Sequence, residues 1–235
     1  MTKGQSKMPS LRLPQGLLFI FCLLPAVQTL VSVYWQWHTP VTYPTLKSVM
    51  ILIPILVWHH WRRLGISVRE RLGWTRPSLK GSLGMGVLMS GLILGAYFIF
   101  LRDSLDPSPI IGKVASLKLT DYYWTMAIVI SLWNSLFEEY YWRAFIISEL
   151  HSYLSSRSLV CLLGGFLFGL HHILALLHLF DWPIVAICTL GTMAAGAMWS
   201  WMRLRGLSIW DCYFSHIAAD LSVMWIGYDL IVRGG

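Results

Sequence analysis

The 235-residue chain contains little charge: only 12% of its residues are Asp, Glu, Lys or Arg, against about 25% in soluble domains. Among the charged residues, the 11 acidic ones are fewer than the 18 basic ones. Hydrophobic residues make up 56% of the chain. This composition excludes an ordinary soluble domain and indicates an integral membrane protein. The net charge of +7 does not indicate a nucleic-acid partner. The basic residues lie in short segments between apolar stretches, as in cytoplasmic loops that face anionic lipid.

Several common chemical motifs are also missing. The sequence has no HExxH, GxSxG, P-loop or CxxC motif. The four cysteines lie in apolar stretches without a motif spacing, so they indicate no disulfide framework (Cys22, Cys161, Cys188 and Cys212). There is no internal repeat and no low-complexity linker, so we expect residues 1–235 to form a single integral membrane domain.

Uncharged stretches predict an all-α, polytopic bundle of about seven to eight transmembrane spans. A helix needs about 20 residues to cross the hydrocarbon layer. Seven stretches meet this requirement with some flanking residues: 17–34, 48–61, 82–101, 122–137, 158–180, 182–202 and 212–228. An eighth span would require a break in the long first run, at Pro25 or near Thr39 and Pro40, or a re-entrant segment over 143–154.

The distribution of Lys and Arg predicts the orientation of these spans. A cytoplasmic N-terminus, beginning with the polar segment 1–10, places most basic residues in the cytoplasm. The opposite side then keeps only Lys47, Arg102, Lys113, Lys118 and Arg233. We expect the following apolar run to be a retained first helix rather than a cleaved signal. Seven spans would leave the C-terminus outside, and eight would reverse it.

Ionisable residues next to the apolar stretches mark a candidate functional site, because they are costly in lipid. Glu138 and Glu139 directly follow the uncharged stretch 122–137. Arg143 stands four residues after Glu139, an order that favours an ion pair on a helix. Glu138 lies about 100° further round an α-helix, so the same arginine cannot serve both carboxylates. Glu138 therefore needs another partner.

Two later stretches supply candidate partners. Phe168 and His172 form one i, i+4 pair, and His216 and Asp220 form another. A single intramembrane histidine is most often a packing residue, but several polar groups in one small bundle must find one another. His171 points to a different helix face, and we expect it to stay away from the site. A carboxylate and an imidazole that share one water molecule can perform hydrolysis.

The ordered set EExxxR, FxxxH and HxxxD resembles the CAAX prenyl protease type II family, also called the CPBP or Abi family of intramembrane endopeptidases. The motifs stand at 138–143, 168–172 and 216–220, and the resemblance covers residues 122–232. It implies a glutamic-type protease in which Glu138 activates water with help from His172. It also implies an oxyanion-stabilising site built by His216 and residue 220. Supporting roles fall to Glu139, Arg143 and Phe168.

One residue departs from the family pattern. Asp220 stands where the family commonly has Asn, and an ionised carboxylate cannot donate a hydrogen bond to an oxyanion. Asp220 is therefore expected either to be protonated or to orient His216.

The cofactor remains open at this point. Family members have been read both as metal-free and as metal-dependent enzymes. Two histidines and one glutamate would suit a divalent metal such as zinc, and its ligands here would be Glu138, His172 and His216.

The function predicted is hydrolysis of a peptide bond in a membrane-associated protein or peptide. Neither the substrate nor a need for prenylation follows from the sequence. A transporter or channel that uses the same residues as a proton or cation relay is the first alternative. It is weakened because no inverted repeat is found. A catalytically silent immunity or scaffold protein of the same fold is the second alternative.

Overall fold

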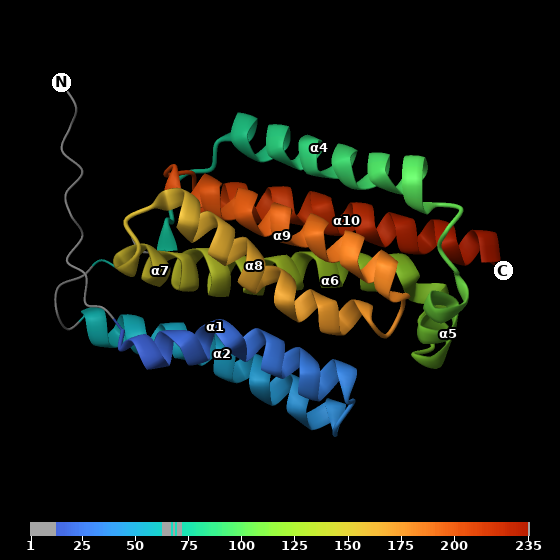
Figure 1. Cartoon of the computed structure of the whole chain (residues 1–235), viewed down its shortest axis with the longest axis horizontal. Coiled ribbons are helices and arrows are strands. Elements are labelled where there is room, and N and C mark those ends of the chain that lie inside the picture. Colours follow the sequence, from blue (N-terminus) through green and yellow to red (C-terminus); the bar gives the residue numbers. More distant parts are fainter. Residues whose placement is uncertain (1–12, 63–66, 68, 70–71, 235) are drawn as a thin grey trace.

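The computed structural model describes residues 13–62, 67, 69 and 72–234, and every element in that part of the chain is helical. The long helices run roughly alongside one another as a bundle (Figure 1). The predicted all-α fold is thus confirmed. The segment 1–10, on which the predicted cytoplasmic N-terminus depends, lies outside the described residues.

The described helices follow one another in chain order. Their bounds are α1 Gln15–Thr29 with the π-helical turn Leu30–Tyr34, α2 Thr39–Arg62, α4 Leu79–Ala96 with the π-helical turn Tyr97–Leu101, α5 Ser108–Ser116, a 3₁₀ turn Thr120–Tyr122, α6 Tyr123–Glu138, the π-helix η4 Glu139–Ile146, α7 Ile147–Tyr153, α8 Arg157–Leu176, α9 Trp182–Leu204 and α10 Ile209–Gly234.

Within the described residues, five helices are long and apolar enough to cross a membrane: α1, α2, α4, α8 and α9, with the π-helical turns that extend α1 and α4. Two further long helices complete the bundle. One is the uninterrupted rod formed by α6, η4 and α7, and the other is α10. These two helices carry the acidic residues of the first and third motifs, and these charges lower their hydrophobicity.

The structure corrects two details of the predicted spans. The first apolar run turns at Gln36 and His38, which both have positive φ (52° and 44°), and α2 begins at Thr39. Lys47 therefore lies within α2, and its predicted loop position is wrong. Proline in a first helical turn costs little, because the N–H that it lacks would have no partner there, so α2 can start at Thr39-Pro40. The segment 143–154 continues the α6 rod and does not re-enter.

A buried carboxylate joins two helix N-termini at one end of the bundle. Asp211 Oδ1 accepts hydrogen bonds from the Ser78 amide (2.7 Å) and the Ser82 hydroxyl (2.6 Å) at the start of α4. Its Oδ2 accepts one from the Ser208 amide (2.9 Å) at the start of α10. One side chain thereby satisfies amide groups that helix starts leave without partners. It also fixes α4 against α10, which pack along each other (Figure 1).

Small residues allow α8 to approach α9 closely. A Cβ atom on Gly165 would lie 2.4 Å from the Met193 carbonyl oxygen, and one on Gly169 would lie 2.3 Å from the Met193 side chain. Such close backbone approach is the usual way in which helices associate in membranes. It also fixes the position of Phe168, which is fully buried one turn before His172.

Candidate active site

Three helices place their polar residues at one point in the bundle. The α6 rod contributes Glu138 and Glu139, α8 contributes His172, and α10 contributes His216 and Asp220. Glu138 is only 7% exposed and His216 only 3%. Each of the three sequence motifs therefore reaches the same buried region, although the motifs are far apart in the chain.

The π-helix η4 allows two adjacent glutamates to contact the same imidazole. Glu139 Oε1 lies 2.8 Å from His216 Nδ1, and Glu138 Oε2 lies 3.7 Å from His216 Nε2. In an α-helix these side chains would point about 100° apart. π-Helical segments are rare and frequently occur at functional sites. Here the wide turn begins directly after Glu138.

Glu139 also forms the ion pair that the sequence predicts. Arg143 Nη1 lies 3.3 Å from Glu139 Oε1, and both side chains are buried. The guanidinium packs over the rings of Phe168 (4.4 Å) and Trp199 (5.0 Å). It also donates a hydrogen bond to the Gly196 carbonyl at 3.3 Å. Glu139 and Arg143 thus join the α6 rod to α8, α9 and α10.

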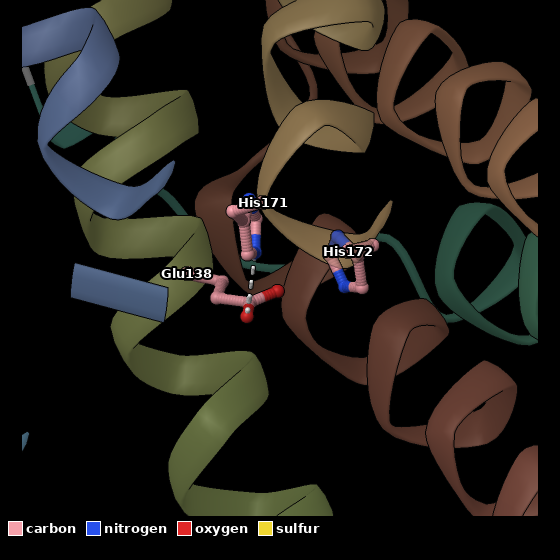
Figure 2. A group of neighbouring side chains, drawn as sticks. All are labelled: Glu138, His171 and His172. Carbon is pink, nitrogen blue, oxygen red and sulfur yellow. Dashed lines mark ion pairs between the residues drawn. The ribbon is translucent and has the colours of Figure 1, made fainter. Parts of the chain in front are cut away.

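The two carboxylate oxygens of Glu138 have different surroundings. Oε1 accepts a hydrogen bond from Asn134 Nδ2 at 2.8 Å and lies 3.6 Å from His171 Nε2. Oε2 has no hydrogen-bond partner among the described residues. Figure 2 shows the carboxylate pointing from α6 towards His171 and His172 on α8. Glu138 is therefore held by a hydrogen bond through one oxygen, while the other oxygen is buried without one and faces His216.

Contacts on Nδ1 orient two of the site histidines. His172 Nδ1 lies 3.0 Å from the Phe168 carbonyl oxygen. A carbonyl only accepts hydrogen bonds, so Nδ1 carries the proton and Nε2 presents a lone pair. His216 Nδ1 contacts Glu139, and its ring stacks on Trp199 with centroids 4.0 Å apart.

Asp220 completes the contacts of His216. Its Oδ1 lies 3.5 Å from His216 Nε2, and its Oδ2 accepts a hydrogen bond from the Ser135 hydroxyl at 2.9 Å. Both carboxylate oxygens thus face groups of the protein.

A small cavity lies beside Glu138. It has a volume of about 20 Å³ and is lined by Glu138 and His171 together with Gln28 of α1 and Lys47 of α2. A space of this size holds about one water molecule. The polar lining provides donors and acceptors that such a water molecule requires.

The described residues contain a group suited to a metal ion. Glu138, His171 and His172 each offer a ligand atom, and these atoms all lie within 4.8 Å of one another. The free Nε2 of His172 and the open Oε2 of Glu138 fit this role. Two imidazoles and a carboxylate form a common catalytic zinc site. The sequence predicts His216 as the third ligand, whereas the structure groups His171 with Glu138 and His172.

Sequence reasoning gave too little weight to three residues around Glu138. His171 was expected to stay away from the site, yet its Nε2 lies close to Glu138. His171 pairs with the carboxylate, and His172 lies beside it on α8 (Figure 2). Asn134 stands four residues before Glu138, a spacing that could have indicated the contact. Lys47 was missed because its helix begins earlier than expected.

The fold and the site together define a class of protein. It is a helical membrane protein with acids and imidazoles gathered beside a water-sized cavity. Residues 120–222 match the family model described as type II CAAX prenyl endopeptidase Rce1-like. This region, slightly less than half of the chain, holds all three motifs and is similar to the CAAX prenyl protease type II (CPBP) family of intramembrane proteases. The predicted resemblance is thus confirmed. Searches of curated proteins and of solved structures returned no match.

Proposed function

We propose that the protein hydrolyses a peptide bond in a membrane-associated protein or peptide, with Glu138 as the general base for the attacking water. The single observation that carries this proposal is that Glu138 lines a water-sized cavity and has a buried Oε2 without a hydrogen-bond partner among the described residues. A general base must reach its water directly or through one intermediary. The family match to intramembrane proteases supports the same reaction class.

The proposed reaction assigns a task to each contact. Asn134 holds Glu138 Oε1, so that Oε2 takes a proton as the water oxygen bonds to the carbonyl carbon. A ring nitrogen of His172 lies within 4.8 Å of a carboxylate oxygen of Glu138, near enough for one water molecule to contact both. The proton then passes to the leaving amine as the carbon–nitrogen bond breaks. His216, oriented by Glu139 and Asp220, faces the carboxylate from α10.

A divalent metal ion would fit the same residues, but Glu138 would then serve as a ligand rather than as the general base. Glu138, His171 and His172 would hold it. When bound, a divalent metal lowers the pKa of its water and polarises a carbonyl.

The test uses the purified full chain in detergent with a quenched fluorescent peptide library. We expect the wild type to cleave a subset of peptides and Glu138→Gln to cleave none. Asp121→Asn is the matched control, because it removes an exposed carboxylate outside the site. Wild-type turnover in Glu138→Gln would refute the proposal. Turnover equal to wild type after complete removal of metal by a strong chelator would assign the water to the carboxylate and imidazoles alone.

A further inference from the structure

The proposed hydrolysis needs hydrogen-bond donors for the oxyanion. In the third motif, His216 and Asp220 already contact other groups of the protein. Asp220 accepts from Ser135 and faces His216 with its other oxygen. His216 directs Nδ1 to Glu139, and its Nε2 lies between the carboxylates of Asp220 (3.5 Å) and Glu138 (3.7 Å). Both ring nitrogens of His216 therefore face acids. The Asn that the family commonly has would provide an amide donor, and Asp220 does not.

Two residues with hydrogen-bond donors line the same cavity as Glu138. Gln28 of α1 is only 4% exposed, and its Nε2 has no hydrogen-bond partner among the described residues. A buried donor without a partner costs about 1–3 kcal/mol. Buried amides are nearly always paired, so an exception calls for an explanation. Gln28 lines the same cavity as Glu138, which places this donor beside the reacting groups.

Lys47 of α2 provides the second donor. Its ammonium group lies within a helix apolar enough to span the membrane, where a positive charge is costly and usually functional. Its Nζ donates one long hydrogen bond of 3.5 Å to Asn134 Oδ1. An ammonium group has three donors. Lys47 therefore keeps donor capacity while it lines the cavity.

We propose that Gln28 and Lys47 form the oxyanion-stabilising pair of this protein. The inference depends on the proposed hydrolysis and adds two catalytic residues from outside the matched region 120–222. As the water oxygen bonds to the carbonyl carbon, the carbonyl electron pair moves onto oxygen, and the water proton goes to Glu138. Gln28 Nε2 and Lys47 Nζ then donate to that oxygen until the carbon–nitrogen bond breaks. The amine leaves with the proton.

A second role for Lys47 must be separated from this one. The ammonium could serve only to balance the charge of Glu138, to which Asn134 connects it. Charge balance would not involve Gln28, because its amide is neutral. Removal of the Gln28 donor therefore distinguishes the two roles. An oxyanion donor acts in the transition state, so its loss lowers kcat and leaves KM nearly unchanged.

The experiment measures kcat, KM and thermal stability for Gln28→Leu and Lys47→Met with one cleaved library peptide. Loss of one oxyanion donor typically lowers kcat about 10²–10³-fold, and we expect this loss in each variant with little change in KM. Met50→Leu is the matched control, because Met50 lines the same cavity without a hydrogen-bond donor. Lys47→Arg retains donors and is expected to recover part of the lost kcat.

Glu138→Gln, measured in parallel, separates the possible failures. If Glu138→Gln is inactive while Gln28→Leu and Lys47→Met keep wild-type kcat, the oxyanion assignment is wrong and the proposed base stands. Loss confined to KM or to thermal stability would also overturn the assignment. If Glu138→Gln keeps wild-type turnover, the proposed function fails together with this inference.

Discussion

Two buried acidic centres in this bundle differ in how completely their hydrogen bonds are satisfied. Asp211 is 1% exposed, and both of its oxygens accept hydrogen bonds from the starts of α4 and α10. Glu138 and Glu139 are also buried, yet each has an Oε2 without a hydrogen-bond partner among the described residues. A complete set of partners stabilises a structure, whereas an open oxygen remains available for a substrate or a water molecule.

The largest expected difference lies between the two adjacent glutamates. Glu138→Gln should abolish hydrolysis, since general-base catalysis typically contributes about 10²–10⁴-fold, while thermal stability stays close to wild type. Glu139→Gln should instead lower stability by about 3–5 kcal/mol, because it leaves the Arg143 guanidinium buried without its ion-pair partner. Unfolding and turnover measured on both purified variants provide the test. A stable, inactive Glu139→Gln beside an active Glu138→Gln would show that the base is the other carboxylate.

Asp211→Ala tests the satisfied centre. It leaves the amides of Ser78 and Ser208 without their acceptor, while the Ser82 hydroxyl can still donate to the Ser78 carbonyl oxygen at 3.0 Å. We expect a loss of about 2–6 kcal/mol in unfolding free energy, since each of the two amides left unpaired costs about 1–3 kcal/mol. The kcat of the folded fraction should stay unchanged. A selective loss of kcat at wild-type stability would contradict the structural role.

Gly165→Ala probes the packing that positions the histidines of α8. The added methyl group would lie 2.4 Å from the Met193 carbonyl oxygen and 2.8 Å from the Ala197 amide nitrogen. Overpacking of this kind typically costs about 1–3 kcal/mol. Thermal unfolding measures this cost, and Gly191→Ala on α9, where a Cβ atom meets nothing within 4 Å, is the control. Equal unfolding temperatures for the two variants would argue against close contact between α8 and α9.

Asp220→Asn should have the smallest effect. The amide can still accept from the Ser135 hydroxyl and contact His216, so we expect activity close to wild type. Asp220→Leu removes both contacts and should lose activity. Initial rates at matched expression provide the measurement. Inactivity of the Asn variant would show that the negative charge of Asp220 is itself required.

Sequence patterns predicted the helical membrane fold and the three motifs, because apolar length and i, i+4 spacing are local properties. The ion pair between Glu139 and Arg143 is of this kind. The sequence did not show that His171 also reaches Glu138, because this contact depends on how α8 lies against the α6 rod. The contact of Lys47 with Asn134 joins helices far apart in the chain, and a helical pattern carries no signal for such pairs.

The formal charges of the polar groups at the candidate site do not balance. Lys47 and Arg143 bring two positive charges, whereas Glu138, Glu139 and Asp220 bring three negative ones. An uncompensated charge is expensive in a medium of low dielectric constant, so electroneutrality favours one additional proton on the cluster. Peptide-bond cleavage requires a proton for the departing amine. The resting protein would then already hold one proton equivalent before a substrate arrives.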